Sequence, residues 1–162
     1  MTRQITYFSL GSNLGDRQKN LEKARLSIIR RIGRHAVTSA IYESVPWGYN
    51  SDHLYLNLCT GVETGLGPMA ILDEVLAIEK GLGRQREARG YIDRTIDIDI
   101  LFCGNRIIRD HHLTVPHPAM EKRRFVLAPL NDIVPDLVHP ISGLTVSEML
   151  IRCRDESVVR RL

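Results

Sequence analysis

The chain has 162 residues, of which 43% are hydrophobic and 25% are charged, and its formal net charge is +3. This length and composition fit one compact globular domain, expected here over residues 1–162. No run approaches the roughly 18 apolar residues of a transmembrane helix, and the N-terminal segment lacks a signal-peptide core. We therefore expect a cytoplasmic protein without membrane contact, and the small net charge alone does not indicate nucleic-acid binding.

Hydrophobic spacing predicts the elements in chain order. A strand is expected over residues 5–10, followed by a helix whose apolar residues recur at helical spacing from Leu21 to Ile32. Gly33 is predicted to end this helix in a left-handed conformation. Further strands are expected over residues 37–43, 54–62 and 95–102, with 106–109 returning antiparallel. Further helices are expected over residues 68–81, 119–130 and 146–151.

The resulting order, β-α-β-β-α-β, is typical of ferredoxin-like folds. We therefore predict an α+β protein with a mainly antiparallel sheet flanked by helices in three layers (α/β/α). The segment from Leu82 to Arg94 is polar and rich in Arg, and it is predicted to be a long loop. Long loops inside compact domains usually serve a function.

Asp97 and Asp99 carry the most specific chemical signal in the sequence. Side chains two residues apart in a strand lie on one face, roughly 7 Å apart at about 3.3 Å per residue. Such carboxylates repel each other unless a cation neutralises them, and Ile96, Ile98 and Ile100 are expected to cover the opposite face. Oxygen ligands without a nearby His or Cys favour Mg²⁺. The alternative is a solvent-exposed strand face that pairs with Arg.

Arginines lie shortly before this acidic pair, at Arg84, Arg86 and Arg94. Guanidinium groups suit bidentate binding of phosphate. A metal site beside phosphate-binding arginines is the equipment of phosphoryl transfer. The sequence has neither a P-loop nor a dinucleotide-binding glycine motif, so side chains are expected to hold the phosphates.

Aromatic residues fall in or beside the predicted loops at Trp47, Tyr55 and Phe125, and Asn57 lies close to Tyr55. Rings and an amide would suit a flat heterocyclic ligand, although each ring taken alone is more often core filling. His117 lies between two prolines, which suits a fixed contact with a phosphate or ribose. A structural turn histidine is equally consistent with that position.

A series of ordered motifs covers nearly the whole chain. They are Gly11 to Gly15, Tyr42 to Gly48, Tyr55 to Asn57, Gly83 to Arg86, Arg94 to Leu101, Leu113 to Pro118 and Arg123 to Leu127. In this order the sequence resembles the 6-hydroxymethyl-7,8-dihydropterin pyrophosphokinases, and the block Arg94-Thr95-Ile96-Asp97-Ile98-Asp99 is the most specific match. It departs from the family pattern at Tyr91-Ile92-Asp93, where the family commonly shows Trp-Gly-Pro, and thereby adds a carboxylate beside Arg94.

The resemblance implies transfer of diphosphate from ATP to the hydroxymethyl group of 6-hydroxymethyl-7,8-dihydropterin, giving AMP and the pterin diphosphate in folate biosynthesis. It also implies two Mg²⁺ ions held by Asp97 and Asp99, and catalytic roles for Arg84, Arg86 and Arg94. Separately, we expect a monomer. The implied pterin contacts are Ser44, Val45, Trp47, Tyr55, Asn57 and Phe125. The implied ATP contacts are Glu79, Arg84, Tyr91, Arg94, Ile100, His112, Thr114, His117, Pro118 and Arg123.

The competing prediction is a ferredoxin-like RNA-binding module with an Arg-rich loop. Such a module displays aromatic side chains on its central strands. Residues 95–102 instead carry two carboxylates, which would repel phosphate unless they bind metal. Release of AMP from ATP that depends on the pterin would discriminate between the two predictions.

Overall fold

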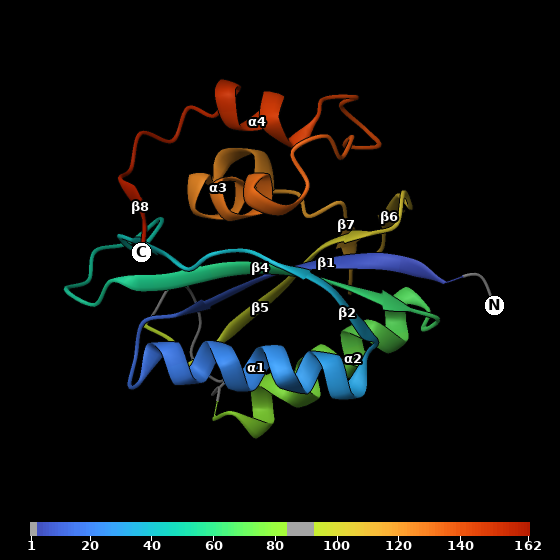
Figure 1. Ribbon diagram of the computed structural model, residues 1–162, viewed down its shortest axis with the longest axis horizontal. Helices are drawn as coiled ribbons and strands as arrows, with labels where there is room; N and C mark the ends of the chain where they lie inside the picture. The colour runs from blue at the N-terminus through green and yellow to red at the C-terminus, as the bar shows by residue number, and fades with distance from the viewer. Residues whose placement is uncertain (1–2, 84–92) are drawn as a thin grey trace.

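The computed structural model describes residues 3–83 and 93–162, which form a sheet with helices on both faces (Figure 1). The strands are β1 (Gln4–Ser12), β2 (Arg34–Thr38), β3 (Tyr42–Ser44), β4 (Tyr55–Thr64), β5 (Asp97–Cys103), β6 (Ile108–Arg109), β7 (Thr114–Val115) and β8 (Val159–Arg161). The helices are α1 (Arg17–Arg31), α2 (Pro68–Gly81), the short 3₁₀ helix η1 (Met120–Lys122), α3 (Arg124–Ile133) and α4 (Val146–Arg152).

The main sheet is built around β1 and β4, its two longest strands. Its strands follow the order β5-β1-β4-β3-β8, and β2 pairs with β4 as well. All of these pairings are antiparallel. The structure therefore confirms the predicted α+β class and antiparallel sheet, and the order of elements from β1 to β5 is compatible with the ferredoxin-like arrangement.

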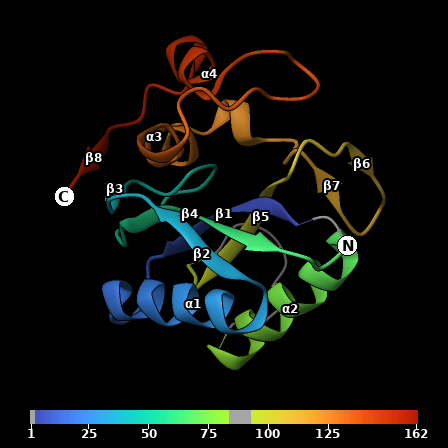
Figure 2. The same ribbon diagram turned by 45° about the vertical axis from the view of Figure 1, so that its right-hand side comes forward.

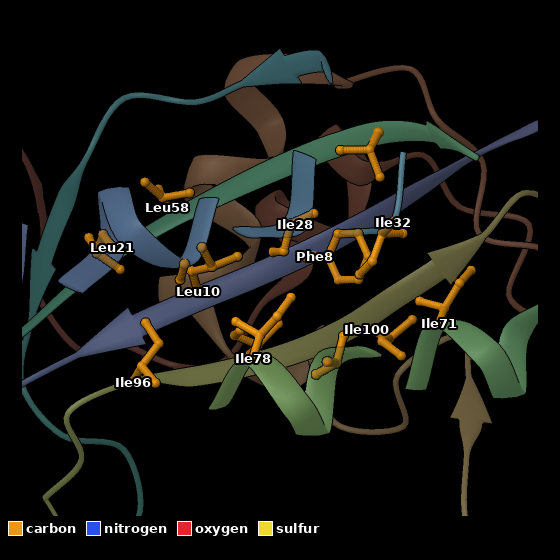
Figure 3. Packing of buried hydrophobic residues seen from close by; sticks show 14 of the residues in the cluster. Phe8, Leu10, Leu21, Ile28, Ile32, Leu58, Ile71, Ile78, Ile96 and Ile100 are labelled. Carbon is orange, nitrogen blue, oxygen red and sulfur yellow. The ribbon is translucent and has the colours of Figure 1, made fainter. Parts of the chain in front are cut away.

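Each face of the sheet buries its own hydrophobic core. Helices α1 and α2 cover one face, and α3 and α4 cover the other, which gives the three predicted layers (Figure 1, Figure 2). The first core joins alternate residues of β1, such as Phe8 and Leu10, to Ile28 of α1 and Ile78 of α2 (Figure 3). The second core contains Leu127 of α3 and residues of α4. Alternation along the strands thus assigns each side chain to one layer.

Local sequence signals explain where the helices begin. The carboxylate of Asp16 accepts a hydrogen bond from the backbone amide of Lys19 at 3.1 Å and so caps α1. Pro68 is the first residue of α2, a position where its missing N–H is not needed. Thr145 and Glu148 form a reciprocal capping box at the start of α4. Among the described helices, none is both long and apolar enough to cross a membrane.

Two of the predicted strands are wrong. The single strand expected over residues 37–43 is divided into β2 and β3, because the hydroxyl of Ser39 accepts the hydrogen bond of the Cys59 amide at 2.9 Å. Residues 108–109 pair with β7 rather than returning along β5. Strand β8, which adds to the edge of the sheet at β3, was not predicted from the sequence.

The prediction for Gly33 is wrong, since its φ is not positive and it therefore does not have a left-handed conformation. It is required for a different reason. A Cβ atom on Gly33 would lie 2.2 Å from the backbone oxygen of Glu63 in β4. The end of α1 therefore approaches the sheet more closely than any side chain would permit.

Candidate active site

Three neighbouring strands form the floor of the site. Gly11 of β1 pairs with Asn57 of β4 on one side and with Asp97 of β5 on the other. Two residues along the ladder, and therefore on the same face, Ser9 pairs with Asp99. A Cβ atom on Gly11 would lie 3.3 Å from Oδ1 of Asn57, so glycine keeps this part of the floor flat.

A pocket of about 230 Å³ opens above this floor, on the face of the sheet that carries α3. Side chains from β1, β4, β5, the segment after β3 and the start of α3 contribute to it. Its lining residues are Ser9, Gly11, Ser44, Val45, Trp47, Tyr49, Tyr55, Asn57, Arg94, Asp97, Asp99, His117, Arg123 and Phe125. All six residues predicted to contact the pterin and both predicted metal ligands are therefore brought together in one pocket.

Rings and a buried amide form one side of the pocket. Asn57 is only 2% exposed, and its side-chain nitrogen donates to the hydroxyl of Ser44 at 2.8 Å. Burial raises the pKa of Tyr55, and its hydroxyl lies 3.0 Å from that of Tyr49. The phenol of Tyr55 therefore stays protonated at neutral pH. This side combines flat apolar surface with a few fixed polar atoms, as sites for planar ligands do.

The opposite side of the pocket is charged. Asp97 and Asp99 project from β5 into it, while Ile96, Ile98 and Ile100 are buried on the other face, as predicted. Arg123 places a guanidinium nitrogen 3.5 Å from Oδ2 of Asp99. The guanidinium therefore offsets part of the repulsion between the two carboxylates.

Arg123 also bridges the charged side to the rings. Its guanidinium carbon lies 4.7 Å from the centre of the Trp47 ring and 5.8 Å from that of Phe125, distances suited to cation–π attraction. Its buried Nε atom has no hydrogen-bond partner among the described residues. A buried donor of this kind is satisfied when a ligand offers an acceptor.

His117 is held as a neutral imidazole at the charged side. Burial, followed by the charge of Arg123, lowers its pKa to about 4, and Asp97 opposes this shift. Its Nδ1 accepts a hydrogen bond from the amide of Ala119 at 3.2 Å. Because the neutral ring carries one proton, that proton is on Nε2, which lies 3.9 Å from Oδ2 of Asp99.

The two carboxylates lie beside arginine and neutral histidine side chains, which can donate hydrogen bonds to phosphate. This combination fits a divalent cation bound together with phosphate. Asp97 and Asp99 offer oxygen ligands, which Mg²⁺ prefers. Mg²⁺ usually completes its coordination shell with water and substrate phosphates. The buried Nε of Arg123 supplies a donor for those phosphates. The chemistry of these residues therefore fits the predicted metal.

Several predicted ATP contacts do not line the pocket. Ile100 is 6% exposed and packs in the core beneath the sheet, and Glu79 accepts a hydrogen bond from the backbone amide of Ile98 at 2.9 Å. His112 is exposed, and its ring lies 4.0 Å from that of His111. Neither Thr114 nor Pro118 is among the lining residues. Contacts of these residues with ATP remain predictions, and Arg84, Arg86 and Tyr91 lie outside the described residues.

Three lining residues were not predicted from the sequence. Ser9 and Gly11 are the β1 partners of Asp99 and Asp97, and the alternation of β1 could have placed them on the same face. Tyr49 is in the segment between β3 and β4, where no periodic signal exists. Only the fold brings it to Tyr55.

Comparisons with known proteins give a consistent result. A sequence profile of the family 7,8-dihydro-6-hydroxymethylpterin-pyrophosphokinase (HPPK) matches residues 7–135. A Porphyromonas gingivalis protein named 2-amino-4-hydroxy-6-hydroxymethyldihydropteridine pyrophosphokinase is 44% identical over 139 residues, which cover 84% of this chain and 94% of that protein. A Haemophilus influenzae protein of the same name is 39% identical over 155 residues, covering 95% of this chain and 96% of that protein.

Solved structures share the fold. A protein described as HPPK-DHPS in complex with substrates superposes on 94% of this chain with a TM-score of 0.75 and 16% sequence identity. Wild-type Plasmodium falciparum HPPK-DHPS with SDX-DHP superposes on 93% of this chain with a TM-score of 0.74 and 17% identity. This chain spans 43% and 44% of the lengths of those two chains. At such identity the likeness supports the fold alone.

Proposed function

The chain belongs to the 7,8-dihydro-6-hydroxymethylpterin-pyrophosphokinase family, and from this premise we propose how its pocket carries out the family's reaction. The reaction transfers diphosphate from ATP to the hydroxymethyl group of 6-hydroxymethyl-7,8-dihydropterin, a step of folate biosynthesis. The hydroxymethyl oxygen bonds to the β-phosphorus, and the bond from that phosphorus to the oxygen of AMP breaks. The hydroxyl proton is released, so the products are AMP and the pterin diphosphate.

One observation carries the assignment of this pocket as the active site. Rings and a fixed amide line one side, and two carboxylates with Arg94, His117 and Arg123 line the other. A planar heterocycle and a polyphosphate need these two kinds of surface next to each other, because transfer requires the reacting atoms to be about 3–3.5 Å apart.

The pterin is assigned to the side formed by Trp47, Tyr55 and Phe125, whose rings stack on its two faces. Asn57 faces its edge and supplies a fixed hydrogen-bonding group. Because Ser44 already accepts from the nitrogen of that amide, the carbonyl oxygen of Asn57 is left for donors of the ligand. Ser44 and Val45 complete this edge of the pocket.

The triphosphate is assigned to the charged side. Arg94 and Arg123 neutralise its oxygens, and the Nε2–H of His117 can donate to a phosphate oxygen without adding charge. Asp97 and Asp99 would hold the Mg²⁺ ions. Bound there, Mg²⁺ would supply positive charge that offsets the charge developing on the phosphates during transfer. We also propose that the protein acts as a monomer.

AMP release tests the proposed function directly. The protein is incubated with ATP and Mg²⁺, with and without 6-hydroxymethyl-7,8-dihydropterin, and AMP is measured. We expect AMP only when both substrates are present, and we expect a chelator to abolish its release. AMP formation that ignores the pterin, or its absence with both substrates present, contradicts the proposed reaction.

The RNA-binding alternative has no support in these comparisons. The aromatic residues of β1 and β5 are Tyr7, Phe8 and Phe102, and they are 7%, 0% and 1% exposed. Rings buried under helices cannot stack on bases, which is how sheet-based RNA modules bind.

A further inference from the structure

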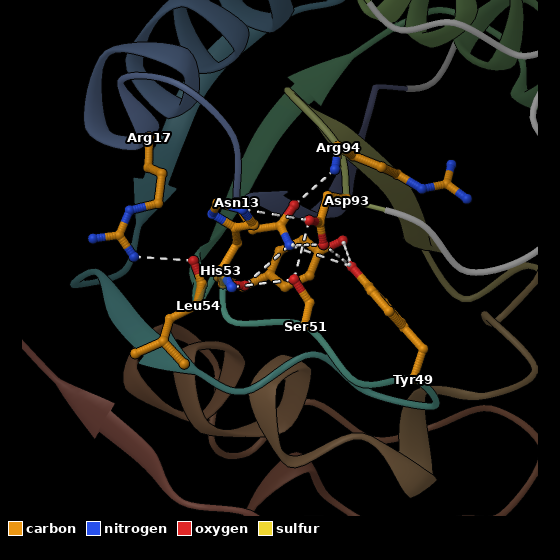
Figure 4. Close-up of polar contacts among 9 residues, drawn as sticks. Asn13, Arg17, Tyr49, Ser51, His53, Leu54, Asp93 and Arg94 are labelled. Atoms are coloured by element: carbon orange, nitrogen blue, oxygen red, sulfur yellow. Dashed lines mark hydrogen bonds and ion pairs between the residues drawn. The ribbon is translucent and has the colours of Figure 1, made fainter.

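A carboxylate beside the pocket gathers three hydrogen bonds from distant parts of the chain. Oδ1 of Asp93 accepts from the side-chain amide of Asn13 at 2.8 Å and from the hydroxyl of Tyr49 at 3.1 Å. Oδ2 accepts from the hydroxyl of Ser51 at 3.0 Å. Figure 4 shows these three side chains converging on Asp93. The Asp93 side chain is 26% exposed, so most of it is covered.

These hydrogen bonds favour the ionised carboxylate. Burial raises the pKa of Asp93, but the hydrogen bonds from Ser51, Asn13 and Tyr49, with the nearby His53, together hold it below its ordinary value. Asp93 is therefore negatively charged at neutral pH. Charge-assisted hydrogen bonds are stronger than neutral ones, which makes this junction firm.

Asn13 connects Asp93 to the backbone of Arg94 and of His53. It is 2% exposed, and its Oδ1 accepts from the backbone amide of Arg94 at 2.7 Å. Its own backbone amide donates to the carbonyl oxygen of Arg94 at 3.0 Å. Its side-chain nitrogen also donates to the carbonyl oxygen of His53 at 3.1 Å. The backbone of Arg94 is thus fixed to Asn13, the residue that follows β1, and through Asn13 and Asp93 to the segment between β3 and β4.

The two segments joined in this way line opposite sides of one pocket. The hydroxyl of Tyr49 lies 3.0 Å from that of Tyr55, and both rings line the side assigned to the pterin. Arg94 lines the side assigned to the triphosphate. The Tyr49 hydroxyl accepts from the side-chain nitrogen of Asn13 at 3.3 Å and donates to Asp93, the residue next to Arg94 in the chain, at 3.1 Å.

We propose that Asp93 is a positioning residue that couples pterin binding at the Tyr49–Tyr55 side to nucleotide binding at Arg94. The proposal rests on the function proposed above, because it uses the assignment of the two substrates to the two sides. When the nucleotide fixes Arg94, Asp93 fixes Tyr49, so the pterin side loses less freedom when the second substrate binds.

The test measures the coupling itself. The dissociation constant of 6-hydroxymethyl-7,8-dihydropterin is determined by calorimetry with Mg²⁺, in the presence and absence of an ATP analogue with a methylene group between the α and β phosphorus. The ratio of the two constants is the coupling factor. We expect at least about fivefold in the wild type, the lower end of common coupling energies, and a ratio close to one for Asp93→Ala.

A conservative variant separates positioning from general stability. The amide in Asp93→Asn can still accept from Asn13 and Tyr49 through its oxygen and can donate to Ser51 through its nitrogen. We therefore expect Asp93→Asn to retain most of the coupling factor. Asp136→Ala, at an exposed position after α3, is the matched control and should leave the factor unchanged. Thermal unfolding of each variant shows whether it is folded.

Failure of the coupling role and failure of the proposed function give different results. A wild-type ratio near one, or an Asp93→Ala ratio equal to that of the wild type, overturns the coupling role. If Asp93→Ala does not fold, Ser51→Ala removes one donor and leaves the carboxylate, and it must then lower the ratio for the proposal to stand. A wild type that releases no AMP with both substrates contradicts the proposed function instead.

Discussion

The side-chain nitrogen of Asn57 donates a hydrogen bond to the hydroxyl of Ser44 at 2.8 Å, in a place where both side chains are buried. This contact fixes which way the amide faces, because its nitrogen, and not its oxygen, must point toward Ser44. Gly11 lies beside that oxygen. The orientation of Asn57 toward the pocket is therefore set by a neighbour in the next strand.

Ser44→Ala tests this orientation. Loss of one hydrogen bond costs about 1 kcal/mol, or roughly a fivefold change in an equilibrium constant. We expect the KM for the pterin to rise by about that factor while kcat and the KM for ATP change little. Steady-state kinetics check this, with Ser142→Ala at an exposed turn as the control. An unchanged KM for the pterin would contradict the orienting role of Ser44.

Asp97→Asn and Asp99→Asn test the proposed metal ligands. Each change keeps the shape of the side chain and removes its charge. We expect kcat to fall by about two orders of magnitude or more, as when a charge-stabilising group is lost from an active site. Pterin binding without nucleotide, followed by fluorescence, should persist. Turnover that survives in these variants at saturating Mg²⁺ argues against metal binding by the pair, and Asp136→Asn should behave as the wild type.

Gly33→Ala tests the close approach of α1 to the sheet. The added methyl would meet the backbone oxygen of Glu63 at 2.2 Å, and that backbone cannot move freely because Glu63 pairs with both Ile5 and Arg34. We expect a loss of about 1–3 kcal/mol in the free energy of unfolding. Urea denaturation checks this.

Gly65→Ala is the matched control, because a Cβ atom there meets nothing within 4 Å. Its free energy of unfolding should stay within about 0.5 kcal/mol of the wild type or rise slightly, since alanine restricts the unfolded chain. Equal destabilisation by both substitutions would show that the contact with Glu63 is not the cause.

The lowered pKa of His139 predicts that the free energy of unfolding depends on pH. Burial lowers its pKa, and Glu121 opposes the shift, while its Nδ1 accepts hydrogen bonds from the amides of Ile141 and Ser142 at 3.2 Å. The unfolded chain therefore binds this proton more readily than the folded protein. Stability is present above the unfolded pKa of about 6.5 and falls as the pH drops below it.

Urea denaturation between pH 5 and pH 7.5 measures this slope. His139→Asn keeps an acceptor in the turn but cannot titrate, so its free energy of unfolding should fall less steeply toward low pH than that of the wild type. His117 has a lowered pKa too, so part of the slope should remain. Identical slopes in the two proteins would exclude His139 as a contributor.

The sequence predicted those parts of the fold that depend on local pattern. The alternation in β5 placed Asp97 and Asp99 on the pocket face, and the spacing of apolar residues located α1 and α2. It failed where partners distant in the chain decide the outcome. β8 forms by pairing with β3, and its three residues carry no alternation of their own that distinguishes it from a loop.

The candidate site was predicted in the same uneven way. Trp47, Tyr55 and Phe125 follow from the family resemblance, and the fold brings their side chains to one pocket. Tyr49 and Asn13 could not be identified, because their role depends on Asp93, which is far away in the sequence. Hydrogen bonds between irregular segments leave no periodic trace that a single sequence can reveal.

The alternation along β5 also protects the chemistry from folding errors. Each carboxylate is flanked by isoleucines that are buried on the opposite face. A slip of one residue against β1 would move both carboxylates into the hydrophobic core and turn the three isoleucines toward the pocket. Mispaired chains are thus disfavoured by the same interior that stabilises the correct ones, and a correctly folded chain already has its acidic pair facing the pocket.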